Sequence, residues 1–215
     1  MTFAIVLFGW IFSLCLHEFS HALVAYYGGD YTVREKGYLT FNPLKYTHPV
    51  FSLLLPLLFL VMGGIGLPGG AVYIERDRIR NRFWLSAVSL AGPLANLLIA
   101  IILGLVLRFS ATTNSGVWPG LSFLLVLQVS AVLFNSIPLP PFDGYGILEP
   151  FLSRPIRDQV DSFRGMAIWI ILLVFWYVPA VSSSFWNTVF QVSTTLGVDW
   201  GLVMIGLQRF RFWEL

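Results

Sequence analysis

Two histidines and a glutamate near the start of the chain form a pattern that can hold a metal ion. Residues His17-Glu18-Phe19-Ser20-His21 are an H-E-x-x-H motif. On a helix, residues four apart share one face, so the two imidazoles can bind the same ion. Glu18 is turned away from them by roughly 100° but can still reach a water molecule beside the metal. The motif therefore indicates metal-assisted hydrolysis.

The motif lies inside an apolar stretch, residues 3–27. A lone buried histidine is more often a hydrogen-bonded core residue than a ligand. Three ionisable groups in one apolar span, however, cost several kcal/mol together unless they have a partner. A metal ion supplies that partner, so we expect metal binding here.

A catalytic zinc ion has three protein ligands and one open position, so a further ligand is needed. Asp143 is the best candidate, because it follows an apolar stretch through a segment with three prolines, 138–141. Prolines prevent a regular helix, and irregular backbone at membrane depth is tolerated only where it lines a protein cavity. The other candidates are less well placed. Glu149 is close to an arginine-rich loop and is interpreted as solvated or interfacial, and Asp199 as an interfacial residue of an imperfect span.

The composition excludes a soluble protein. Of the 215 residues, 57% are apolar and only 11% are charged, whereas soluble domains carry roughly 25% charged residues. The net charge is only +2, which gives no strong field for nucleic acids. A single cysteine, Cys15, excludes an internal disulfide. What remains is an all-α polytopic membrane protein.

Apolar stretches of about 20 residues predict transmembrane helices. Five are found, at 3–27, 84–107, 119–137, 166–181 and 185–207. A sixth, 50–67, is short and contains Pro56 and several glycines, so we expect it to be re-entrant; the alternative is six plain spans. The prediction is thus five to six transmembrane helices in one integral-membrane domain, 1–215. Residues 1–150 would form its catalytic core and 151–215 its C-terminal transmembrane helices.

The loop 28–49 and the basic residues complete the expected topology. Aromatic and β-branched runs at 31–33 and 38–41 flank a charged, glycine-containing turn, which favours a small membrane-associated β-hairpin. With a re-entrant segment, twelve of the thirteen basic residues fall on one side, which the positive-inside rule makes cytosolic. This arrangement predicts an N-terminus outside and a C-terminus in the cytosol.

Further motifs resemble the site-2 protease family of intramembrane zinc metalloproteases over roughly residues 1–150. Besides the H-E-x-x-H motif, the resemblance rests on Ala91-Gly92-Pro93-Leu94-Ala95-Asn96, which is expected to open the next helix, and on Asn135-x-x-Pro138 followed by Asp143-Gly144. Phe41-Asn42-Pro43-Leu44-Lys45 is also similar to a segment of some members. The segment after Asn42-Pro43 departs from the family, because it carries Tyr46 and His48.

The resemblance implies one zinc ion per chain, held by His17, His21 and Asp143, with Glu18 as general base. It also implies that Asn135 lies near the scissile peptide, where it steadies the oxyanion or binds substrate backbone. From the residues alone, Asn135 could instead hydrogen-bond the proline-rich backbone, and Asn96 could cap a helix, bind across helices or contact substrate. Gly92-Pro93 could start a helix or serve packing.

We therefore expect a protease that cuts within the transmembrane segments of other membrane proteins. Its partners would be those substrates and the lipid bilayer, not nucleic acid. We expect a multi-pass protein of the cell (inner) membrane with its active site nearer the cytosolic face. Two alternatives use the same ligands: a membrane zinc transporter or sensor, and a catalytically inactive scaffold that binds transmembrane helices. Transporters favour repeated sites, which are not seen, and a scaffold would not require Glu18.

Overall fold

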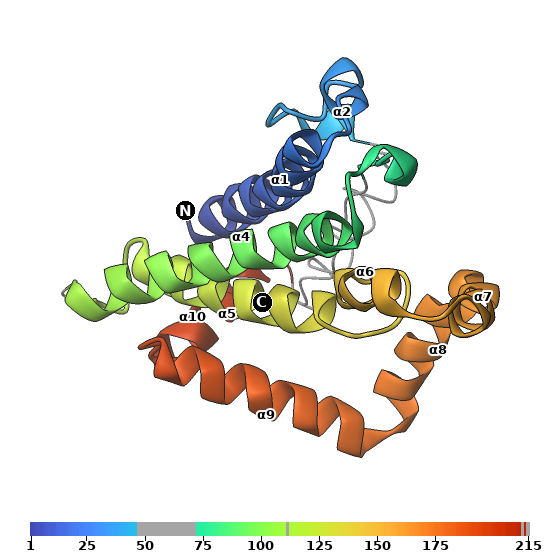
Figure 1. The fold of residues 1–215 in the computed structure, drawn as a ribbon. Helices are drawn as coiled ribbons and strands as arrows, with labels where there is room; N and C mark the ends of the chain where they lie inside the picture. The colour runs from blue at the N-terminus through green and yellow to red at the C-terminus, as the bar shows by residue number, and fades with distance from the viewer. Residues whose placement is uncertain (47–71, 111, 212, 214–215) are drawn as a thin grey trace.

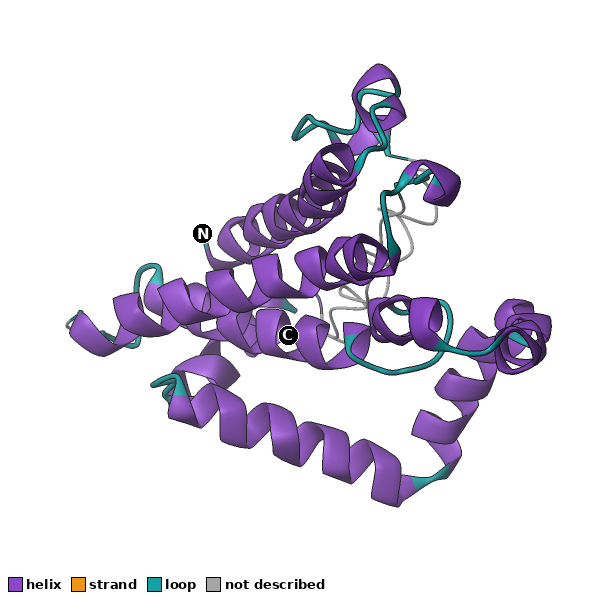
Figure 2. Cartoon of the chain, in the orientation of Figure 1, coloured by secondary structure: helices purple, strands orange, loops and turns teal. Residues whose placement is uncertain are grey.

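The computed structural model describes residues 1–46, 72–110, 112–211 and 213, and these form helices and loops without strands (Figures 1 and 2). The α-helices in chain order are α1 (Thr2–Gly28), α2 (Thr32–Glu35), α4 (Arg82–Phe109), α5 (Trp118–Asn135), α6 (Asp143–Leu148), α7 (Arg154–Ser162), α8 (Arg164–Tyr177), α9 (Pro179–Thr195) and α10 (Trp200–Phe210). Short 3-10 helices lie at Pro43–Lys45, Arg76–Arg78 and Glu149–Phe151. The all-α prediction is confirmed for this part of the chain.

Three helices, α1, α4 and α5, form the centre of the molecule (Figure 1). They are 27, 28 and 18 residues long, and each is long and apolar enough to cross a membrane. In α5, 78% of the most apolar window is buried inside the protein, so this helix lies in the middle of the core. The predicted spans 3–27, 84–107 and 119–137 are confirmed as helices with nearly the same bounds, and their length and apolar composition indicate a membrane protein.

The last two predicted spans, 166–181 and 185–207, are broken helices in the structure. A bend of 65° separates α7 from α8, and a bend of 116° separates α9 from α10. The apolar run at 166–181 is interrupted because Pro179 starts a new helix at its N1 position. The run at 185–207 is interrupted because the side chain of Asp199 accepts hydrogen bonds from the backbone N–H groups of Gly201 and Leu202 and so caps α10. Counting each bent pair as one span gives up to five spans.

The predicted β-hairpin in the loop 28–49 is also wrong within the described residues, because a short helix, α2, begins where its first strand was expected. Asp30 is fully buried, and its Oδ1 accepts hydrogen bonds from the backbone N–H and the hydroxyl of Thr32 at 3.0 and 2.6 Å. Such a local side-chain bond starts a helical turn instead of an extended strand. The predicted re-entrant segment 50–67 lies outside the described residues.

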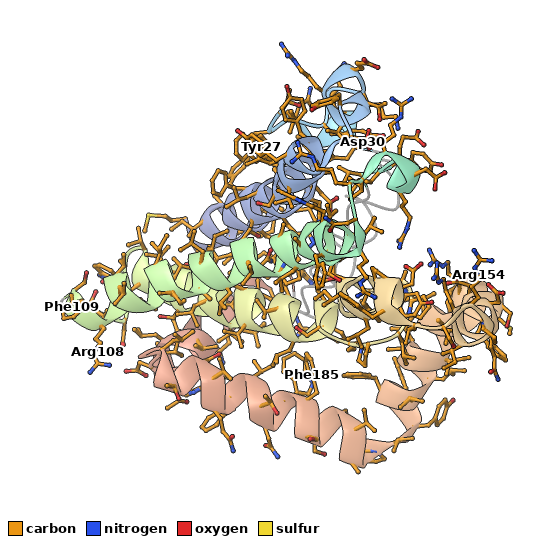
Figure 3. The ribbon with its side chains drawn as sticks, in the orientation of Figure 1. Tyr27, Asp30, Arg108, Phe109, Arg154 and Phe185 are labelled. Carbon is orange, nitrogen blue, oxygen red and sulfur yellow. The ribbon has the colours of Figure 1, made fainter. Side chains whose placement is uncertain are left out.

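The two ends of the chain approach each other, which corrects the prediction that they lie on opposite sides. The ring of Phe210, at the end of α10, stacks on Phe3 at 5.3 Å between centroids. The chain reaches this end because α9 returns along the core and its last residues meet Gly104 of α4. Arg108 lies at this end of α4, and Arg154 lies at the opposite end of the molecule (Figure 3).

Candidate active site

Three potential metal ligands converge between α1, α4 and α6. The Nε2 atoms of His17 and His21 lie 3.0 Å apart, and Asp143 places one carboxylate oxygen 3.1 Å from His17 Nε2 and the other 3.4 Å from His21 Nε2. Ligand atoms about 2.0–2.1 Å from a tetrahedral zinc ion lie roughly 3.3 Å from one another. The spacing therefore fits a single ion, and it forms with both histidines buried.

The other ring nitrogens of the two histidines are held by α4. His21 Nδ1 lies 2.6 Å from the backbone oxygen of Val88, and His17 Nδ1 lies 2.9 Å from Asn96 Oδ1. A backbone oxygen only accepts, so His21 carries a proton on Nδ1. In the neutral form of His21, the lone pair on Nε2 then faces the Asp143 carboxylate. Asp143 Oδ2 is buried and meets no well-aligned hydrogen-bond donor among the described residues. Converging lone pairs without donors are what a cation would stabilise.

Space for the ion comes from Gly92, which lies on α4 between Val88 and Asn96. These three positions are four residues apart and therefore share one face of the helix. A Cβ atom on Gly92 would overlap with the Nε2 atoms of both histidines. The expectation that Gly92-Pro93 opens a helix is wrong, because α4 begins at Arg82 and contains Pro93 in its interior. The packing role is the one that the structure supports.

Asp143 reaches the histidines because the chain turns back after α5, so that α6 packs against α4. The segment 136–142 is not α-helical, as its prolines predicted, and α6 then begins at Asp143 itself. Gly144 permits this close approach, since a Cβ atom there would lie 2.5 Å from the carbonyl carbon of Ser136 and also meet its oxygen. The rigid connection thus carries the carboxylate back to α1.

Glu18 and Asn135, the two predicted catalytic residues, line one cavity with the three potential ligands. The cavity has a volume of about 410 Å³, and both residues are buried. Its remaining wall comes from the segment 72–74, the N-terminal part of α4, residues 141–142 before α6, and the start of α8, which contributes Arg164 and Ile168. The structure therefore brings Glu18, Asn135 and Asp143 together with the two histidines in one cavity. Asn96 lies behind His17 and is not among the residues that line this cavity.

A second, smaller cavity of about 160 Å³ shares Asp143 and Phe142 with the first and reaches toward the arginine-rich end of the molecule. It is lined by Arg76 and Glu149, which form an ion pair at 2.9 Å. Glu149 is only 5% exposed. Of the two interpretations of Glu149, solvated or interfacial, the first is therefore wrong, because Glu149 is buried and pairs with Arg76 from a distant loop.

Other residues near the site were not predicted. Tyr46 is buried, and its hydroxyl lies 3.0 Å from the backbone oxygen of Cys15 and 2.8 Å from that of Thr40, which ties the loop after α2 to α1. Burial, with the nearby Cys15 and Glu18, raises the pKa of Tyr46, so it remains a donor. Gln128, inside the apolar span of α5, was also missed, although a buried amide in such a span is a signal in itself. His48 lies outside the described residues.

The site is thus a candidate mononuclear metal centre inside a bundle of apolar helices, and comparisons with known proteins agree with this class. The chain is 45% identical over 215 residues to Rip2 of Mycolicibacterium smegmatis, named as a zinc metalloprotease, with 99% of this chain and 82% of that protein covered. It is 39% identical over 214 residues to Rip2 of Mycobacterium tuberculosis, with the same two shares covered. YwhC of Bacillus subtilis, also named as a zinc metalloprotease, is 31% identical over 188 residues, which cover 82% of this chain and 81% of that protein.

No family model matches the chain, and no solved structure matches it. The identity to the zinc metalloproteases over nearly the whole chain is nevertheless sufficient. The chain belongs to the site-2 protease family of zinc metalloproteases.

Proposed function

We propose that this protein is an intramembrane zinc metalloprotease that hydrolyses peptide bonds within the transmembrane segments of other membrane proteins. The observation that carries the proposal is the convergence of His17, His21 and Asp143 inside apolar helices, with Glu18 in the same cavity. The names of the relatives support zinc as the metal.

One zinc ion would be held by His17 Nε2, His21 Nε2 and one oxygen of Asp143. When bound, the ion supplies Lewis acidity to a water molecule and to the peptide carbonyl. Val88 and Asn96 orient the two imidazoles toward it.

The remaining chemistry falls to two side chains of the cavity. Glu18 takes the proton from the attacking water and passes it to the nitrogen of the leaving amine. The Asn135 amide donates a hydrogen bond to the oxygen of the scissile carbonyl as negative charge develops there. A substrate helix hides its carbonyls in hydrogen bonds, so it must unwind locally before attack, and residues with low helix propensity lower that cost.

The position of the histidines along α1 supports cleavage inside the membrane. His21 and His17 are about 10 Å and about 16 Å from the end of α1 at Gly28, at 1.5 Å per residue. Most of the basic residues belong to segments at this end, namely residues 30–46, residues 76–82, α7 and the start of α8 (Figure 1). The positive-inside rule then makes this end cytosolic, so cleavage would fall in the cytosolic half of the substrate's span.

The orientation can be tested on intact cells with single cysteines and a membrane-impermeant reagent, in a Cys15→Ala background. Cysteines at Ser115 and Arg209 should react from outside, and a cysteine at Arg154 should not. The reverse pattern would place the metal site at the outer face.

The Glu18→Gln variant tests the function itself. It should keep zinc at the wild-type amount and lose hydrolysis of a transmembrane substrate in detergent or vesicles by about a thousandfold or more, because only proton transfer is removed. Zinc retention with undiminished cleavage would refute the role of Glu18. If the wild type and Glu18→Gln both transport zinc and neither cleaves the substrate, the zinc transporter is favoured.

Mass spectrometry of the products locates the cleaved bond. Cuts confined to exposed loops of the substrate would refute cleavage within the membrane.

A further inference from the structure

A buried chain of hydrogen bonds runs from His17 across all three core helices. His17 Nδ1 lies 2.9 Å from Asn96 Oδ1, and Asn96 Nδ2 donates to Gln128 Oε1 at 3.3 Å. Gln128 Nε2 donates to Ser13 Oγ at 3.0 Å, and Ser13 donates to the backbone oxygen of Trp10 at 2.8 Å. This series of hydrogen bonds thus leaves α1 at His17, passes through α4 and α5, and returns to α1.

Every polar side chain in this path is at most 6% exposed, and Gln128 is fully buried. A buried amide among apolar helices is costly unless its donors and acceptors are paired. Gln128 is paired on both sides, with Asn96 through its oxygen and with Ser13 through its nitrogen.

The path has a direction because it ends on a backbone oxygen, which only accepts hydrogen bonds. Ser13 gives its proton to that oxygen and offers a lone pair to Gln128. The amide nitrogen of Gln128 therefore faces Ser13, and its carbonyl oxygen faces Asn96. Asn96 must then turn its nitrogen to Gln128 and its oxygen to His17.

The direction matters for His17 because an asparagine amide can present either an acceptor or a donor to it. If Asn96 presents its oxygen, His17 must carry its proton on Nδ1, which leaves the lone pair on His17 Nε2, where the metal would bind. A flipped amide would require the proton on Nε2 and so block that ligand. His21 does not face this ambiguity, since its partner is the backbone oxygen of Val88.

We propose that Gln128 is a positioning residue for the metal centre: it fixes the orientation of the Asn96 amide and thereby the protonated nitrogen of His17. This inference rests on the proposed zinc site. Gln128 contacts neither metal nor substrate and acts through Asn96 alone. The opposite orientation of the chain would require Ser13 to give up its bond to Trp10.

A double-mutant cycle tests the proposal, with the dissociation constant of zinc measured by competition against a chelator in purified, detergent-solubilised protein. Gln128→Met removes the acceptor for Asn96 at similar volume and should weaken zinc binding about tenfold, within the range for outer partners of metal ligands. Asn96→Asp offers only acceptors to His17 and has no orientation to choose. In that background, Gln128→Met should change zinc affinity less than about twofold.

Ser130→Ala is the matched control, since Ser130 is a buried polar residue on α5 whose hydroxyl, among the described residues, bonds to Leu127 of its own helix. Its zinc affinity should stay at the wild-type value. If Gln128→Met does not fold, Ser13→Ala replaces it in the cycle. Ser13→Ala should weaken zinc binding about threefold when Asn96 is present and should leave it unchanged when combined with Asn96→Asp.

Two results would overturn the proposal: wild-type zinc affinity in Gln128→Met, or an equal loss in both backgrounds, which would mean that Gln128 only packs the helices. A wild-type protein that binds no zinc would overturn the proposed metal centre itself, and this inference with it.

Discussion

The helices α1, α4 and α5 differ from the C-terminal helices α8 and α9 in how they contact their neighbours. The core helices meet through buried polar groups and close backbone approaches, such as Asn96 with Gln128 and Gly92 beneath the histidines. The C-terminal helices contact the core through aromatic rings: Phe185 of α9, labelled in Figure 3, lies against Phe134 of α5 at 4.4 Å between centroids. Polar contacts are directional and aromatic contacts are adaptable, so we expect the core to set the metal geometry and the C-terminal helices to set overall stability.

Two glycines on α4 give the strongest test of this difference between the core and the C-terminal helices. Gly92→Ala should weaken zinc binding about a hundredfold or abolish it, because the new methyl group overlaps with both histidines. Gly104 is equally crowded, but its Cβ would lie 2.6 Å from the backbone oxygen of Leu196, at the end of α9. Gly104→Ala should therefore cost about 1–3 kcal/mol of stability and keep one zinc per chain. Metal analysis and thermal unfolding of both variants check this, and equal zinc loss in the two would contradict it.

The aromatic contact predicts a smaller effect with no loss of metal. Phe185→Ala removes a ring that packs against both Phe134 and Phe175. It should lower the free energy of unfolding by about 1–3 kcal/mol, since the ring is only partly buried. Leu173→Ala on α8, where the side chain is 56% exposed, is the control and should change stability little. Loss of zinc in Phe185→Ala would mean that α9 helps to shape the site.

The smallest effect is expected where the C-terminal region meets the cavity. Asp161 forms an ion pair with Arg164 at 2.9 Å and accepts a hydrogen bond from Tyr145 at 3.2 Å. The pair is partly exposed, so Asp161→Asn should cost less than about 1 kcal/mol and leave zinc content unchanged. Thermal unfolding and metal analysis measure both quantities. A larger loss of either would show that Arg164 is held by this pair as part of the site.

The residues that the sequence selected for the site lie together in the structure, whereas the architecture around them departs further from the prediction. His17, Glu18 and His21 are fixed by a local helical spacing, and Asp143 by a proline-rich segment that cannot be helical. Both patterns lie within a few residues of sequence and can be recognised without knowledge of the tertiary structure. The roles of Gly92, Val88 and Gln128 depend instead on how α1, α4 and α5 are aligned, which one chain of apolar residues does not specify.

The errors in architecture have equally local causes. A run of apolar residues does not reveal where Pro179 or Asp199 starts a new helix, so two broken segments were predicted as spans. The strand-forming residues 31–33 were outweighed by Asp30, whose side chain starts a helical turn. Glu149 was assigned to solvent because its partner, Arg76, comes from a loop more than 70 residues earlier in the sequence.

Metal analysis of the purified wild-type protein and of Asp143→Ala tests the central claim most directly. We expect about one zinc ion per wild-type chain, because three ligand atoms converge at distances that fit a single ion. Asp143→Ala should lose most of that zinc and all hydrolytic activity, although both histidines remain. A wild-type protein without zinc, or an Asp143→Ala variant with full zinc content and full activity, would contradict the account.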